Sequence, residues 1–197
     1  MRITSLQKFA GFSLIAFDLA RVGRLLGKII ALTPFFISPA ANAADETTEN
    51  LVQWRAGLSS SAQPNAAFLE LAKARGYDMV INLAPPEYDM AVETEGALLA
   101  KAGVVYVNIP VAWTKPTIED FELFSGVLKA AGKRKVLVHC QVNLRGSSFA
   151  FLYRVIHDGA PVNDSLAKLT GIWVPNPTWK KFIESVLEAN GKKVDIF

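Results

Sequence analysis

Cysteine is scarce in this sequence: Cys140 is the only one among 197 residues. A single cysteine excludes an internal disulfide and any zinc site that needs several cysteine ligands. The sequence also lacks internal repeats, heptad runs and low-complexity tracts. We therefore expect a globular domain whose lone thiol, in an oxidising compartment, is either buried or required for function.

An excess of basic residues is also lacking once the N-terminal segment is set aside. Residues 1–43 contain five of the 21 Lys and Arg residues and one of the 18 Asp and Glu residues, so the rest of the chain has a net charge of about −1. The sequence pI near 9.0 thus comes from this segment. The composition gives no support for nucleic-acid binding, and we expect none.

The N-terminal segment has the features of a secretory signal. Basic residues precede the apolar run 29–37, and residues 41–43 give the small-x-small pattern of a signal-peptidase site. Pro34 interrupts the run, which is short for a membrane span. We therefore expect residues 1–43 to be a cleaved signal peptide, with a retained membrane anchor as the alternative. Residues 44–197 then form one periplasmic or secreted domain without stable membrane insertion.

Apolar patterns after residue 50 alternate between strand and helix periods. The expected strands cover residues 51–57, 79–83, 104–111 and 136–138, with a Ser, Pro and Asn turn after the first. The expected helices cover residues 64–76, 94–103, 117–131, the stretch after Arg145, 164–169 and 177–189. Thr117 and Asp120 have the spacing of a capping box. This alternation predicts an α/β domain with a central, mainly parallel sheet flanked by helices.

The most informative stretch runs from Val136 to Ser148. A short aliphatic strand leads to His139 and Cys140, and Arg145 follows at the start of a helix. The N–H groups at a helix N-terminus form a ready site for an anion. The helix dipole and the guanidinium both favour a thiolate, and Arg145 can bind two oxygens of a tetrahedral anion at once. Cys140 also lies at the carboxyl end of its strand, where α/β sheets bind ligands.

This stretch resembles the active-site loop of cysteine-dependent phosphatases of the dual-specificity type. Residues 56–65, 79–87 and 107–111 fall in the family's order before it, and together these segments resemble the bacterial branch over about residues 50–190. The resemblance implies a dual-specificity-phosphatase-like fold and hydrolysis of phosphate monoesters, including phosphotyrosine or phosphoproteins, through a phosphocysteine intermediate. It implies a phosphorylated protein or small molecule as partner, and no metal or cofactor.

The resemblance also assigns roles to individual residues. It implies Cys140 as the nucleophile and Arg145 as the residue that holds the phosphate oxygens. The residues implied to bind substrate belong to the loop, with one nearby tryptophan: His139, Gln141, Val142, Asn143, Leu144, Gly146, Ser147 and Trp113. We expect His139 to order the loop. Ser147 and Ser148 either stabilise the leaving thiolate or cap the helix, and Trp113 either forms a pocket wall or packs in the core.

The loop departs from the family pattern and leaves an alternative open. The family has Cys-x5-Arg with a glycine inside and a hydroxyl residue after Arg, whereas only four residues separate Cys140 from Arg145 here. Asn143 stands near the expected glycine, and Gly146 takes the hydroxyl position. A loop of this shorter length is found in rhodanese-like sulfurtransferases. The alternative function is therefore sulfur transfer through a Cys140 persulfide.

A second departure concerns the general acid. The family supplies an Asp on the loop that corresponds to residues 111–117, and this loop contains no acidic residue here. Asp120 is the candidate acid, although the capping box is the more ordinary role for it. The other alternative is therefore a pseudophosphatase that binds phosphate groups without turnover.

Overall fold

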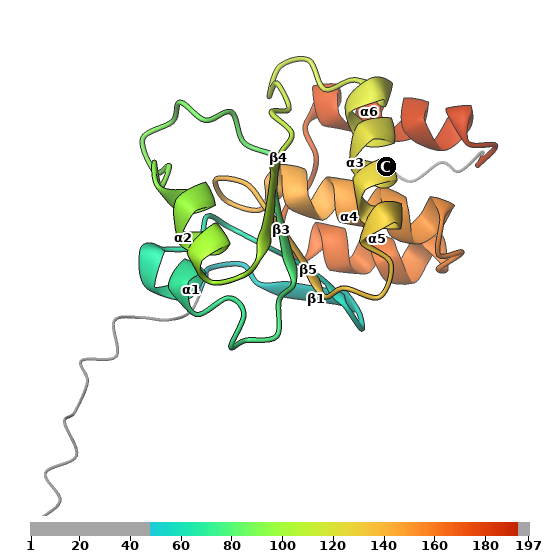
Figure 1. Ribbon diagram of the computed structural model, residues 1–197. Helices are drawn as coiled ribbons and strands as arrows, with labels where there is room; N and C mark the ends of the chain where they lie inside the picture. Colours follow the sequence, from blue (N-terminus) through green and yellow to red (C-terminus); the bar gives the residue numbers. More distant parts are fainter. Residues whose placement is uncertain (1–47, 193–197) are drawn as a thin grey trace, which may run out of the picture. The chain divides into compact units, whose positions relative to one another are not determined.

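The structure of the protein, a computed structural model, describes residues 48–192 (Figure 1). The predicted signal peptide, residues 1–43, lies outside the described residues. Among residues 48–192, no helix is both long enough and apolar enough to cross a membrane.

A five-stranded sheet in the order β1-β2-β5-β3-β4 forms the centre of the domain (Figure 1). Its strands are β1 (Val52–Arg55), β2 (Leu58–Ser61), β3 (Met79–Asn82), β4 (Val105–Asn108) and β5 (Val136–His139). β1 pairs with β2 in antiparallel orientation and the other neighbours are parallel, which confirms the predicted fold class. Because β5 lies between β2 and β3, its last residue, His139, pairs with both Ser61 and Asn82.

The prediction of a turn after the first strand is wrong for residues 58–61, which form β2. Serine is a common turn residue, so this Ser-rich segment carries no strand signal. Packing overrides that preference, because all of β2 is buried and the Trp54 indole Nε1–H donates a 2.8 Å hydrogen bond to Ser60 Oγ. Gly57, with a φ of 80°, forms the turn between β1 and β2, a conformation that glycine adopts without steric cost.

The described helices cover the two faces of the sheet. Figure 1 shows α1 (Ala66–Glu70) and α2 (Glu95–Lys101) on one side, and α3 (Ile118–Ala131), α4 (Leu144–Ile156), α5 (Val162–Thr170) and α6 (Pro177–Ala189) on the other. These positions confirm the predicted helices, except that α1 ends at Glu70 and residues 71–76 form turns. The predicted capping box is also confirmed: the Thr117 N–H donates to the Asp120 carboxylate at 2.9 Å, and the Asp120 N–H donates to Thr117 Oγ1 at 3.2 Å.

Apolar cores lie on both faces of the sheet. The core under α3 to α6 contains Val136, Val138 and Cys140, whereas the core under α1 and α2 contains Leu137. Successive side chains of a strand point to opposite faces. The side chain of His139 therefore belongs to the α1–α2 face, and that of Cys140 belongs to the α3–α6 face.

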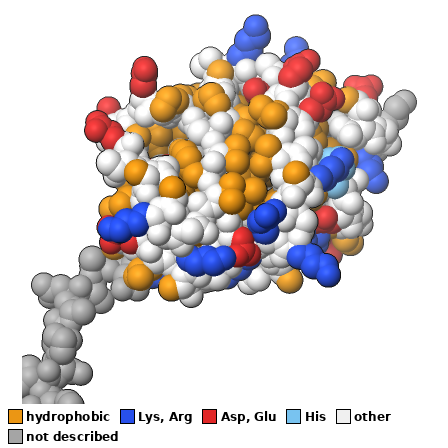
Figure 2. All heavy atoms as spheres, in the orientation of Figure 1, with side chains coloured by type: hydrophobic (Ala, Val, Ile, Leu, Met, Phe, Trp, Pro, Cys, Tyr) orange, Lys and Arg blue, Asp and Glu red, His pale blue; other side chains and the backbone are white. Residues whose placement is uncertain are grey.

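One face of the domain has an apolar centre. Figure 2 shows apolar side chains in the middle of this face, with Lys, Arg, Asp and Glu side chains around them. Strand β4 forms an edge of the sheet. Because charges of both signs surround the apolar centre, this face carries no extended patch of one sign.

Candidate active site

Cys140 lies between the end of β5 and the start of α4. All residues of β5 are buried, and the Cys140 backbone N–H donates a 3.4 Å hydrogen bond to the carbonyl oxygen of Ser61 in β2. Asn143 then adopts the left-handed conformation, with a φ of 72°, and is the N-cap of the 13-residue α4. The first N–H groups of a helix have no partner within it. The thiol therefore lies beside the positive end of the α4 dipole.

The cysteine opens into a small cavity. The cavity has a volume of about 150 Å³ and is lined by Trp113, Cys140, Gln141, Val142, Leu144 and Arg145. A cavity of this size holds several water molecules, which is enough room for a phosphate group. The Cys140 side chain is buried, so the cavity is the route by which a ligand reaches the sulfur. The structure thus brings these predicted site residues together.

Arg145 is held rigidly in this pocket. It is 5% exposed, its Nε–H donates to the carbonyl oxygen of Val111 at 2.9 Å, and its Nη1 donates to Oε1 of Gln141 at 3.3 Å. Its guanidinium carbon lies 5.3 Å from the centre of the Trp113 ring, in a cation–π contact. A guanidinium has five N–H donors. Two of them are used in these bonds, and the fork is already oriented when an anion arrives.

Trp113 has both of the roles that the sequence left open, pocket wall and core packing. Its ring lines the pocket and also packs against Trp179 and Trp173, with ring centres 5.1 and 5.6 Å away. The indole Nε1–H of Trp179 donates a 3.0 Å hydrogen bond to the Trp113 carbonyl oxygen. The loop between β4 and α3 is thereby anchored to α6, and Trp113 forms a fixed wall beside Arg145.

Asn143 and Gly146, the two loop residues that depart from the family pattern, are sterically dependent on each other. A Cβ on Gly146 would lie 2.8 Å from Oδ1 of Asn143 and 3.5 Å from the carbonyl oxygen of Val138. The Asn143 amide group is held there by its Nδ2, which donates a 2.7 Å hydrogen bond to the carbonyl oxygen of Asn50. Asparagine at position 143 therefore requires glycine at position 146, and the hydroxyl residue of the family pattern has no room.

Other predicted site residues lie outside the pocket lining. The hydroxyl groups of Ser147 and Ser148 both donate to the carbonyl oxygen of Leu144, at 3.2 and 2.8 Å. Such bonds to the preceding turn are common for serine in helices. The Asp120 carboxylate accepts the Thr117 N–H of the capping box. The proposed role of Asp120 as an acid, and that of either serine toward the thiolate, stay predictions.

His139 also lies away from the pocket. It is fully buried on the α1–α2 face, and its Nε2 is 2.7 Å from Oε1 of Glu95, the first residue of α2. Sequence reasoning missed Glu95 because acidic residues are common in the first turn of any helix. Only the tertiary fold distinguishes this buried carboxylate from an exposed one.

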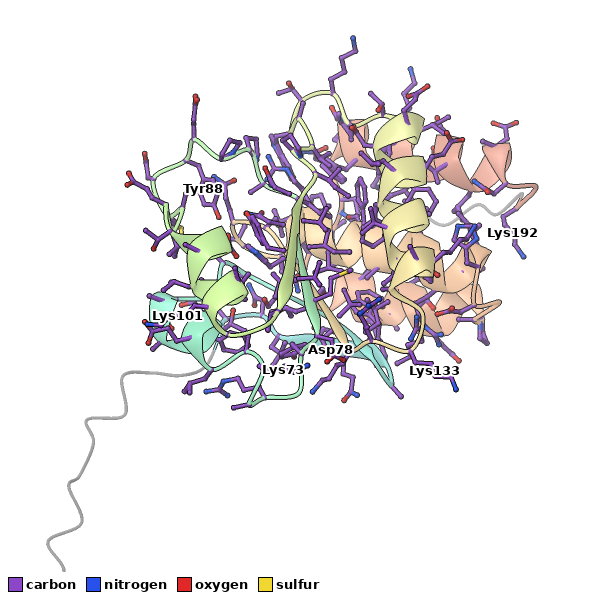
Figure 3. All side chains as sticks on the ribbon, in the orientation of Figure 1. Lys73, Asp78, Tyr88, Lys101, Lys133 and Lys192 are labelled. Atoms are coloured by element: carbon purple, nitrogen blue, oxygen red, sulfur yellow. The ribbon has the colours of Figure 1, made fainter. Side chains whose placement is uncertain are left out.

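Sequence reasoning also missed Tyr88, which Figure 3 shows on the segment between β3 and α2. Its hydroxyl donates a hydrogen bond to Oε1 of Gln63, and the Gln63 N–H donates to the carbonyl oxygen of Gln141 at 3.0 Å. Burial, with the negative charges of Glu95 and the Cys140 thiolate, raises the pKa of Tyr88 well above its usual value. Tyr88 thus lies within the electrostatic field of the site. The sequence signal that could have identified Tyr88 is its position after β3, because ligand sites form at the carboxyl ends of parallel strands.

Comparison with known proteins gives structural relatives. No protein-family model and no curated protein matches the chain. A DUF442 protein from Shewanella putrefaciens CN-32, whose description as a phosphatase is provisional, is 34% identical, with a TM-score of 0.68. The match covers 74% of this chain and 95% of that one. This identity and coverage show a closer relationship than a shared fold alone.

More distant structures share the architecture. TpbA of P. aeruginosa is 22% identical with a TM-score of 0.57, and the match covers 70% of this chain and 84% of TpbA. The core catalytic domain of the PP-IP phosphatase SIW14 from S. cerevisiae is 13% identical with a TM-score of 0.60, over 73% of this chain and 94% of that domain. At these identities the similarity shows the fold alone.

Proposed function

Because the chain belongs to the cysteine-dependent phosphatases of the dual-specificity type, in the group of DUF442 proteins, we propose that it hydrolyses phosphate monoesters with Cys140 as the nucleophile. The observation that carries this proposal is the pocket in which the Cys140 thiol and the buried Arg145 guanidinium meet at the N-terminus of α4. A helix N-terminus and a rigid guanidinium are two independent sources of positive potential. Together they favour a thiolate and a bound phosphate group.

The first step is transfer of the phosphoryl group to sulfur. The Cys140 thiolate attacks phosphorus, an S–P bond forms, and the P–O bond to the leaving group breaks with its electron pair on the leaving oxygen. That oxygen takes a proton from solvent or from an acid in the site. Arg145 and the N–H groups of α4 hold the three oxygens that stay on phosphorus.

The second step releases the enzyme. Water attacks the phosphorus of the phosphocysteine, the S–P bond breaks, and its electron pair returns to Cys140 as a thiolate. One proton of the water passes to solvent, and inorganic phosphate leaves. The aromatic wall formed by Trp113 and the exposed side chain of Val142 favour a substrate with an apolar or aromatic group next to its phosphate, such as phosphotyrosine.

Iodoacetamide labelling at mildly acidic pH tests the nucleophile. We expect Cys140 to be alkylated faster than a free cysteine, because the α4 dipole and Arg145 stabilise the thiolate. Phosphate or vanadate should protect it, since both anions occupy the same pocket. The Cys140→Ser variant is the control, because the chain has no other cysteine. Labelling no faster than that of a free thiol, or without protection by either anion, contradicts the assignment.

Trapping mass spectrometry separates phosphate transfer from the sulfur transfer that the short loop also permits. After exposure to an aryl phosphate we expect a phosphate adduct on Cys140, resistant to reducing thiols. After exposure to thiosulfate we expect no persulfide, which thiols would remove. A persulfide without any phosphate adduct assigns the site to a sulfurtransferase. A pseudophosphatase shows neither adduct, although phosphate still protects the thiol.

We propose further that the protein is exported. The proposal rests on the basic segment, the apolar run 29–37 and the Ala-Asn-Ala pattern at 41–43. N-terminal sequencing of protein made in its own host should give a chain that begins near Ala44. Recovery of the intact leader in the cytoplasmic fraction contradicts export, and recovery of the intact leader in the membrane fraction indicates an anchor.

A further inference from the structure

We infer that Glu95 is a positioning residue for the nucleophile, acting through His139, and this inference rests on the function proposed above. Glu95 and His139 are 3% and 0% exposed, and Oε1 of Glu95 lies 2.7 Å from Nε2 of His139. A buried carboxylate is costly unless it is paired and hydrogen-bonded. The buried Glu95 carboxylate is therefore stabilised by its specific contacts. One of these is with His139, the residue that precedes Cys140.

Two donors hold the second oxygen of the Glu95 carboxylate. Nδ2 of Asn82 donates to Oε2 at 3.1 Å, and the hydroxyl of Tyr106 donates to it at 3.4 Å. Burial and the negative charge of Glu95 raise the pKa of Tyr106 to about 12, so its hydroxyl keeps its proton at neutral pH and remains a donor. With Oε2 held in this way, Oε1 faces the imidazole, 2.7 Å from Nε2 of His139.

Helix α2 approaches the sheet unusually closely at this point. A Cβ on Gly96 would lie 3.1 Å from Cδ1 of Tyr106, which is tighter than ordinary van der Waals contact. Glycine at this position lets the first turn of α2 reach β4. Glu95 is thereby connected to β3 through Asn82, to β4 through Tyr106 and to β5 through His139.

The position of His139 affects that of the nucleophile, because the two residues are adjacent in the chain. The His139 carbonyl oxygen accepts a 2.8 Å hydrogen bond from the Leu83 N–H, so the end of β5 is held by its backbone as well. The imidazole, anchored by Glu95 on one face, resists rotation of the strand end. Cys140, on the other face, is thereby kept in the orientation that faces the pocket. Misplacing a nucleophile even slightly lowers its reactivity.

Glu93 offers a matched control for the loss of one negative charge. It lines the same cavity of about 460 Å³ as Glu95 and Tyr106, but it is exposed and makes no contact with His139 among the interactions of the described residues. Glu93→Gln therefore changes the charge near the cavity without touching the proposed connection to Cys140.

The test is a double-mutant cycle of Glu95→Gln and His139→Gln in the full chain. The two readouts are the rate of Cys140 alkylation by iodoacetamide and the imidazole NMR resonances, with His157, the other histidine, as internal reference. We expect Glu95→Gln to slow alkylation about tenfold and to shift the resonances of His139 but not those of His157. Glu93→Gln should leave both readouts unchanged. In the His139→Gln background, Glu95→Gln should change alkylation by less than about twofold.

Additive effects of the two substitutions, or unshifted His139 resonances in Glu95→Gln, overturn the inference. If Glu95→Gln does not fold, Tyr106→Phe removes one donor to Oε2 and keeps the ring. That variant should shift the His139 resonances in the same way, and an unshifted spectrum overturns the inference. Neither readout requires turnover. A protein that hydrolyses no phosphate ester but shows the coupled alkylation therefore supports this inference and counts against the proposed function.

Discussion

Replacing Arg145 by lysine is expected to lower kcat/KM for an aryl phosphate by roughly thirtyfold to a thousandfold, which corresponds to about 2–4 kcal/mol of transition-state stabilisation. Lysine keeps the positive charge but has a single ammonium group, which cannot bind two phosphate oxygens in one plane. It also loses the contacts that orient Arg145, namely those with Val111, Gln141 and Trp113. The measurement is steady-state hydrolysis of an aryl phosphate.

Two controls separate catalysis from stability in this experiment. The Arg154→Lys variant changes the same residue type on the same helix, where Arg154 forms an ion pair with Asp158 at the surface, and it should retain full activity. Alkylation of Cys140 in Arg145→Lys should stay faster than that of a free thiol, because a cation remains near the sulfur. Full turnover by Arg145→Lys would show that Arg145 is only a structural residue.

The pocket loop could be predicted from the sequence because its signals are local. Cys140, Arg145 and the strand before them are close in the chain, so strand, turn and helix dipole follow from one short pattern. The capping box of Thr117 and Asp120 was predictable for the same reason. Strand β2 was not, because three of its four residues are serines and its place in the sheet comes from pairing with β1 and β5.

The remainder of the site depends on contacts between distant segments. Glu95 and His139 meet only because the side chain of the first residue of α2 reaches the ends of β3 and β5, and no local pattern marks that pairing. Asn143 and Gly146 lie close in sequence and still read as two separate departures from a family pattern. Their dependence on each other arises from the left-handed conformation of Asn143, which places its side chain against the α4 backbone.

The second large effect concerns the leaving group. A general acid contributes roughly a hundredfold to ten-thousandfold by protonating the leaving oxygen, and its contribution grows as that oxygen becomes more basic. The loop of residues 111–117 has no acidic side chain, and the Asp120 carboxylate is engaged in the capping box. We therefore expect hydrolysis rates in a series of substituted phenyl phosphates to fall steeply as the leaving-group pKa rises. Alkyl phosphates should be poor substrates.

Asp120→Asn decides whether that steepness reflects a missing acid. Asparagine retains a carbonyl oxygen that can accept the Thr117 N–H, so the cap and the fold should survive, and the rates should change little. Tyr88 cannot replace a carboxylic acid efficiently, because burial and nearby negative charge raise its pKa well above the usual value and make its hydroxyl a weaker proton donor. A flat series together with a large loss in Asp120→Asn identifies Asp120 as the acid. A flat series with an unaffected Asp120→Asn variant contradicts the absence of an acid. A large loss in Tyr88→Phe would then show that Tyr88 protonates the leaving group despite its raised pKa.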